Sequence, residues 1–188
     1  LETLFADMDR AYATTARQYG FVCHGCADNC CLTRFYHHTL LEYLFLQEGV
    51  RAIEPAGRQA IRDRALAADA LLSAAAPGPA ARVMCPLNRR SRCTLYAHRP
   101  MICRLHGIPY ELHRPDAGAA RYPGCNAFFE QCRERGRSDY IPFDRSPFYR
   151  RMAALERTLR SQAAYTGKIN LTIAQMIVTI TENNDEID

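Results

Sequence analysis

The chain has 188 residues, of which 48% are apolar, so it is long enough and hydrophobic enough to bury a core. No apolar run approaches the ~20 residues that cross a bilayer, and no basic stretch followed by an apolar segment opens the chain, so we expect a soluble, cytoplasmic protein. The formal net charge is +4. Two sites that each held four thiolates and one dication would cancel this charge, so the composition gives no reason to expect nucleic acid as a partner.

The first distinctive segment reads CHGCADNCC and runs from residue 23 to residue 31. Gly25 permits a tight turn between Cys23 and Cys26. The spacing Cys-x2-Cys lets one backbone turn direct two sulfurs at one metal ion. The chain has nine cysteines, an odd number, and its apolar content supports a core without disulfides. We therefore rank metal binding ahead of a disulfide framework.

The adjacent cysteines Cys30 and Cys31 restrict the kind of metal site. Adjacent side chains point about 100° apart on a helix and to opposite faces of a strand, so the pair is poorly suited to one mononuclear ion. We expect the two thiols either to serve two centres or to reach different irons of one polynuclear cluster. The alternative is that one of them is a packed, inert thiol.

Two helices are predicted in the next part of the chain. Thr39-x-x-Glu42 forms a capping box that opens the apolar segment TLLEYLFLQEG, and Gly49 is expected to close that helix. A second helix is expected from Pro55 through the alanine-rich stretch until APGPA, residues 76–80, ends it. Its predicted buried face consists of Ile61, Ala65, Ala68 and Leu72.

A second cysteine group follows with the spacing Cys85-x7-Cys93-x9-Cys103. Arg99 precedes Pro100, which starts a helical turn whose free backbone N–H groups would stabilise a thiolate at Cys103. Arg99 and Arg104 are therefore candidates to bind an anionic cluster, and salt bridges to carboxylates are the equally weighted alternative. The basic stretch NRRSR, residues 88–92, is interpreted as a solvated loop.

From Cys103 to Cys125 the pattern indicates a short extended pair around a Pro/Gly turn, closed by Cys125 at its far end. Cys132 lies in a predicted helix near Phe129. It is interpreted as a buried or unreactive thiol, with a catalytic thiol as the alternative.

The last part of the chain predicts two further elements. Ser146-Pro147 starts an amphipathic helix with apolar residues at Phe148, Met152, Leu155 and Leu159. In residues 170–188 the apolar residues have helical spacing, but many of them are β-branched, so a helix and a strand are both open. We expect this segment to pack on the chain's own core rather than to dimerise, and we expect a monomer or a homodimer.

Taken together, the cysteine motifs resemble those of the CxxCxxxCC (YkgJ-like) cysteine-cluster family, described as a zinc- or iron-chelating domain. The resemblance is carried by CHGCADNCC, by the Thr-x-x-Glu helix start and by C-x7-C-x-LY-x2-RP-x2-CR, and it covers residues 21–125. It implies that eight thiols form the metal site, with Cys125 joining through YPGC: Cys23, Cys26, Cys30, Cys31, Cys85, Cys93, Cys103 and Cys125.

Eight cysteines divide naturally into two sets of four thiolates. Four thiolates can hold zinc as a closed, redox-silent site, and the same ligands satisfy a [4Fe-4S] cluster. Arginine and backbone donors near sulfur suit either centre, and they favour the iron–sulfur cluster slightly because such donors tune its potential.

The sequence thus predicts a mainly α, single small domain with helices around an irregular cysteine-ligated metal core and room for one short β-hairpin. Residues 1–135 are expected to form the metal-binding domain and residues 136–188 a helical extension packed on it. The first functional hypothesis is a metal protein that transfers electrons, or handles or senses iron, with an unidentified protein partner.

Two alternatives stay open at the level of sequence. The first is a zinc-stapled protein-interaction module. The second is an enzyme, because flagellin lysine N-methylase has a similar cysteine cluster and would imply protein-lysine methyl transfer. This sequence shows no glycine-rich strand-turn-helix motif of the kind that holds S-adenosylmethionine.

Overall fold

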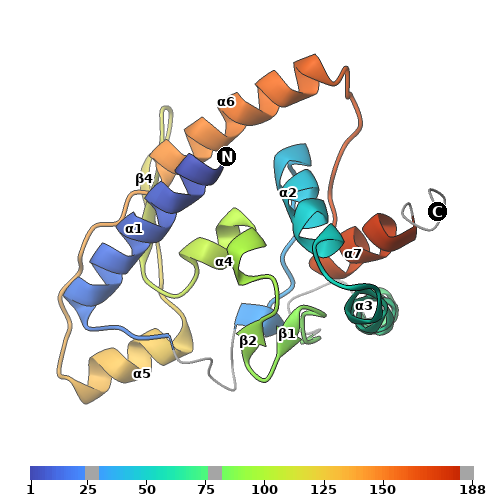
Figure 1. The fold of residues 1–188 in the computed structure, drawn as a ribbon. Helices are drawn as coiled ribbons and strands as arrows, with labels where there is room; N and C mark the ends of the chain where they lie inside the picture. The colour runs from blue at the N-terminus through green and yellow to red at the C-terminus, as the bar shows by residue number, and fades with distance from the viewer. Residues whose placement is uncertain (24–29, 76–81, 183–188) are drawn as a thin grey trace. The chain divides into compact units, whose positions relative to one another are not determined.

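The computed structural model describes residues 1–23, 30–75 and 82–182, and it divides the chain into two compact units (Figure 1). Unit 1 consists of Leu1–Asp28 and Met101–Ala163, and unit 2 consists of Asn29–Pro100 and Ala164–Asp188. The chain is mainly α-helical, as predicted. The boundaries between the two units do not fall at residue 135. The expected division of the chain into residues 1–135 and residues 136–188 stays a prediction.

Unit 1 is built on four helices: α1 (Glu2–Tyr19), α4 (Met101–Leu105), α5 (Asn126–Glu134) and α6 (Ser146–Gln162). Helix α1 packs against α4 and α6 and buries Leu4, Phe5 and Met8. Helix α6 begins at Ser146 with Pro147 in its first turn, as the sequence predicts. Helix α1 is absent from the elements predicted from sequence, although its apolar residues recur at helical spacing.

The expected extended pair is a two-stranded hairpin in unit 1, β3 (Tyr110–Arg114) and β4 (Gly118–Tyr122). The rings of Tyr110 and Tyr122 stack with centroids 4.8 Å apart, at the open end of the hairpin. The guanidinium of Arg145, which is only 1% exposed, lies 3.5 Å from the Tyr110 ring centroid and donates to the Leu105 carbonyl. The hairpin is thus fixed to the start of α6 by a buried cation–π contact.

A buried carboxylate adds a polar contact on the same hairpin. Glu111 accepts hydrogen bonds from His113 Nε2 at 3.0 Å and from Arg121 Nε at 3.1 Å. The hydrogen bond from His113 is the main reason why the pKa of Glu111 is lowered. Ser146 Oγ accepts from the His113 backbone N–H at 2.6 Å, which links β3 to the first residue of α6.

Unit 2 packs α2 (Leu40–Arg51), α3 (Pro55–Ala74) and α7 (Ile173–Glu182) around one apolar core. The predicted face of α3 is confirmed, because Ile61, Ala65, Ala68 and Leu72 are all buried. The proposed break at 76–80 lies outside the described residues. Of the two possibilities for the last segment, the structure has the helix, and α7 buries Met176, Ile177 and Ile180 in this core.

The capping box of α2 is confirmed, but the expected end of this helix is wrong. Thr39 Oγ1 accepts a hydrogen bond from the Glu42 backbone N–H at 3.2 Å. The helix then continues past Gly49 to Arg51. At Gly49 a Cβ would lie 2.5 Å from the ring of His98, so glycine is needed here for close packing and not to end the helix.

The basic stretch interpreted as a loop instead forms a second hairpin, β1 (Asn88–Arg89) and β2 (Arg92–Cys93). Asn88 pairs with Cys93 and Arg89 with Arg92, which leaves Arg90 and Ser91 as a two-residue turn. Both turn residues have positive φ, 51° and 61°, as a type I′ turn requires. Natural type I′ turns favour Asn-Gly, and a side chain in this region costs roughly 1–2 kcal/mol.

Because of the buried His37 side chain, we expect the stability of unit 2 to fall at acidic pH. Its backbone pairs with Leu171 in both directions, its side chain is 2% exposed, and its Nε2 has no hydrogen-bond partner among the described residues. Burial, with a smaller contribution from the charge of His38, lowers the pKa of His37 to about 4. The folded protein therefore resists protonation of this ring, while the unfolded chain takes up a proton near pH 6.5.

The free energy of unfolding should be unaffected by this group above pH 6.5 and should fall by about 3 kcal/mol as the pH drops from 6.5 to 4. Urea unfolding of the wild type, of His37→Leu and of the exposed-site control His38→Asn measures this. The His37 variant should lose this part of the acid sensitivity and the control should keep it. Equal pH profiles for all three proteins would contradict the assignment.

Candidate metal centre

Backbone contacts link three described cysteines of unit 2, Cys31, Cys85 and Cys93, and we call them the thiol triad. Cys31 lies in the 3-10 turn η1 (Cys30–Leu32), Cys85 precedes β1, and Cys93 ends β2. The backbone N–H of Cys85 donates to the Cys31 carbonyl at 2.8 Å. The pairing of Asn88 with Cys93 joins the third member to the other two. Backbone hydrogen bonds therefore bring together thiols that are more than fifty residues apart in sequence.

Backbone N–H groups near the sulfurs of the hairpin cysteines favour their thiolate forms. Those of Leu87 and Asn88 lower the pKa of Cys85, and that of Leu95 lowers the pKa of Cys93, against the larger effect of burial. The two sites share the pattern Cys-x-Leu, in which the leucine side chain is buried in the unit 2 core. Each leucine thereby fixes the peptide that donates to sulfur. Such donors stabilise a thiolate and tune a metal bound to it.

The electrostatics of the triad favour a cation among the sulfurs. Burial, with smaller contributions from the neighbouring Cys31 and Cys93, raises the pKa of Cys85 to about 12. Burial also raises the pKa of Cys93, with a further contribution from Cys31, while the charge of Arg99 lowers it. Cys31 thus makes ionisation of both hairpin thiols less favourable, and Cys93 has the same effect on Cys85. A dication would remove that mutual repulsion, because metal ligation deprotonates thiols.

The donor chemistry fits zinc or an iron–sulfur cluster, since both take thiolate ligands with N–H···S support. Across 1–23, 30–75 and 82–182, no three His, Cys, Asp or Glu side chains form a ready-made coordination group. Cys26 and the side chain of Cys30 lie outside the described part of the structure. Within the triad, the fit therefore rests on ligand type and hydrogen bonding.

Three further predicted ligands that the structure describes, Cys23, Cys103 and Cys125, belong to unit 1. Cys125 precedes α5, and its N–H donates to the Gly107 carbonyl just after α4, the helix that contains Cys103. Cys23 is exposed. It directly follows Val22, whose backbone N–H and C=O both bond to the Gln131 side chain on α5, at 3.0 and 2.8 Å. Helix α5 thus positions both the segment before Cys23 and the turn at Cys125.

The two arginines proposed to bind a cluster have different surroundings. Arg99 lies with its Cζ 3.5 Å from the Tyr96 ring centroid, donates from Nε to the Tyr96 carbonyl, and acts electrostatically on Cys93. Arg104 is buried, pairs with Asp9 at 2.6 Å and lies over Phe5. Arg104 therefore forms a salt bridge to a carboxylate, which was the alternative to cluster binding. Arg99 lies near the thiol of Cys93.

Cys132 lies on α5, outside the predicted ligand set. Burial raises its pKa, and the nearby Arg137 partly offsets this effect. It is a free cysteine with intermediate exposure. These surroundings agree with the expectation of an unreactive thiol, since an activated cysteine needs a lowered pKa.

Comparison with known proteins identifies the family. Residues 22–126 match the model of the CxxCxxCC family, described as a "putative zinc- or iron-chelating domain". The chain belongs to this family. No curated protein and no solved structure matches the chain significantly. The matched range of the CxxCxxCC domain includes all eight predicted ligands and excludes Cys132.

Sequence reasoning missed the backbone donors of the CxxCxxCC domain. The repeated Cys-x-Leu at residues 85–87 and 93–95 is a signal that could have revealed them, because a buried residue two positions after each cysteine fixes the intervening peptides.

The described helices also include none that combines the length and the apolar character needed to cross a bilayer.

Alanine substitutions at two glycines of unit 1 should lower the stability of the protein by different amounts. Gly107 has φ 122°, and a Cβ there would lie 2.7 Å from Tyr12 Oη, whereas Gly118 has φ 67° with open space around it. Gly107→Ala should lower the free energy of unfolding by about 3 kcal/mol or more, because backbone strain and steric overlap add. Gly118→Ala should cost only about 1 kcal/mol of left-handed strain. Similar urea midpoints for the two variants would contradict the close approach at Gly107.

Proposed function

We propose that the chain binds metal through two sets of four thiolates, one set in each unit. The unit 2 set is Cys30, Cys31, Cys85 and Cys93, and the unit 1 set is Cys23, Cys26, Cys103 and Cys125. The division into units supports this assignment, because the predicted ligands with described side chains fall in two groups, with Cys31, Cys85 and Cys93 in unit 2 and Cys23, Cys103 and Cys125 in unit 1. The triad supports it further, since three members of the unit 2 set are already joined by backbone pairing.

We further propose that the unit 2 set holds a [4Fe-4S] cluster used in electron transfer. The observation that carries this proposal is the position of Cys30 and Cys31, which are consecutive residues of one 3-10 turn and lie in the same unit. Consecutive residues of a helical turn direct their side chains about 100° apart, an arrangement that suits two irons of one cluster better than one ion. Backbone N–H groups and the charge of Arg99 would then act on the cluster, whose chemistry is one-electron transfer.

Metal and acid-labile sulfide analysis of protein prepared without air tests the proposal. We expect about four iron and four sulfide for the unit 2 set, with absorbance near 400 nm that dithionite bleaches. Cys93→Ser should lose this iron and keep the metal of unit 1. Cys125→Ser should lose the unit 1 metal and keep the iron and sulfide of unit 2.

Cys132→Ser is the matched control, and it should retain all metal. A colourless protein with stoichiometric zinc and no sulfide would overturn the cluster and would support a zinc-stapled interaction module. Complete loss of metal from both Cys93→Ser and Cys125→Ser would overturn the division into two sets.

A further inference from the structure

The hairpin between Cys85 and Cys93 presents a concentrated positive charge to solvent. Arg89, Arg90 and Arg92 are all exposed, and we call them the basic tip. Within the described part of the chain, none of the three has a carboxylate at ion-pair distance. The three neighbouring positive charges repel one another, which raises the electrostatic energy of the hairpin. Binding of an acidic partner would lower that energy.

Both residues of the turn in the basic tip have a backbone conformation that glycine or asparagine adopts more easily than arginine or serine. Arg90 and Ser91 both have positive φ, in a two-residue turn whose geometry favours Asn-Gly. Local strain is a reason to look for function when the strained residue also contributes chemistry, and here Arg90 adds the third charge.

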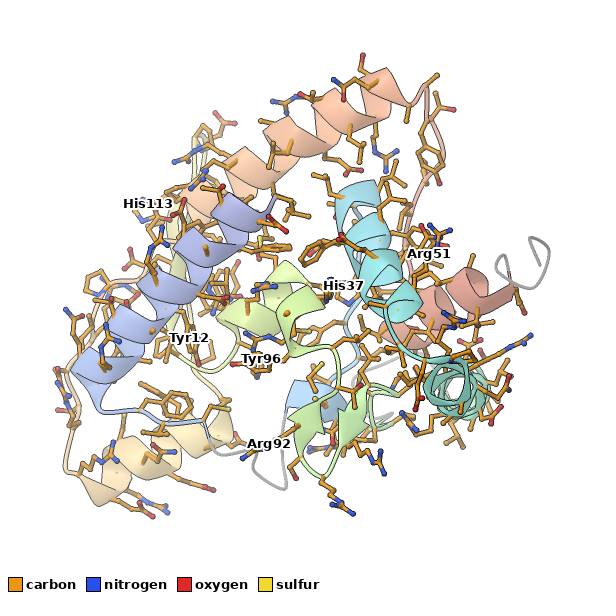
Figure 2. All side chains as sticks on the ribbon, in the orientation of Figure 1. Tyr12, His37, Arg51, Arg92, Tyr96 and His113 are labelled. Carbon is orange, nitrogen blue, oxygen red and sulfur yellow. The ribbon has the colours of Figure 1, made fainter. Side chains whose placement is uncertain are left out.

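An exposed aromatic side chain follows the basic tip closely in sequence. Tyr96, in the 3-10 turn η2 (Tyr96–His98), is 64% exposed, and Arg99 stacks on its ring at 3.5 Å. It comes three residues after the end of β2, and both it and Arg92 are labelled in Figure 2. Tyrosine and arginine are the residue types most enriched at protein–protein hot spots. The stack also holds the Tyr96 ring in place, which lowers the entropy lost on binding.

We propose that the basic tip together with Tyr96 and Arg99 is a docking surface for an acidic protein partner. The surface is continuous in sequence with the thiol triad, because the tip separates Cys85 from Cys93 and Arg99 acts on Cys93. An acidic partner that binds here would dock beside the proposed unit 2 centre, and electrostatic steering would speed its association. A protein is favoured over a nucleic acid because the charge is confined to one short hairpin rather than spread along a groove.

The surface rests on exposure, charge and turn geometry and not on the proposed cluster. Its test can therefore succeed or fail independently of the metal analysis.

Fluorescence anisotropy with a labelled twelve-residue glutamate peptide tests the proposal on the full chain. Replacing the three arginines of the basic tip by glutamine should weaken binding about ten-fold or more, and Tyr96→Ala should weaken it about three-fold or more. A control with the same loss of charge replaces exposed arginines of unit 1 by glutamine, and it should change binding less than about two-fold: Arg114, Arg133 and Arg150.

Arg90→Gly keeps the test valid if the triple variant folds poorly, because glycine relieves the positive φ while it removes one charge. This variant should unfold at the same or a higher urea concentration and still bind the peptide about two-fold or more weakly. Two outcomes would overturn the proposal. One is equal weakening by the tip and control triples, and the other is tighter binding of a twelve-nucleotide oligouridine that the tip triple abolishes.

Discussion

The backbone hydrogen bond from Cys85 to Cys31 is the contact on which the account of unit 2 depends. It joins the turn that contains Cys30 and Cys31 to the start of a hairpin more than fifty residues later. The pairing of Asn88 with Cys93 then adds the third thiol. Because the leucines after Cys85 and Cys93 are buried in the same core as α2, α3 and α7, the packing of unit 2 and the geometry of its thiols cannot be separated.

The thiol triad is an unfavourable arrangement without a cation. Burial and neighbouring thiols raise the pKa values of its hairpin members, while backbone N–H groups at both cysteines and Arg99 at Cys93 favour the thiolates. The raised pKa values keep the hairpin thiols protonated at neutral pH, so a metal has to displace their protons, and a metal bound only by the folded state adds its binding energy to folding. Membership of a family described as zinc- or iron-chelating therefore supports the proposal that the cysteines are metal ligands.

Several features could be predicted from sequence because they depend on local patterns. The capping box of α2, the buried face of α3 and the Pro147 start of α6 follow from short-range rules and are confirmed. The β1–β2 hairpin escaped prediction because its turn lacks the Asn-Gly signal, and Gly49 was misread because its neighbour His98 is remote in sequence. The meeting of Cys31 with Cys85 is likewise a long-range contact that no spacing rule contains.

X-ray absorption spectroscopy of the bound metal tests the central claim most directly, with the wild type compared to Cys93→Ser. The account predicts a first shell made only of sulfur, with metal–sulfur distances of about 2.3 Å, and loss of the unit 2 metal from the variant while the metal left in unit 1 keeps its sulfur shell. A first shell dominated by nitrogen or oxygen, or an unchanged amount of bound metal in Cys93→Ser, would contradict it.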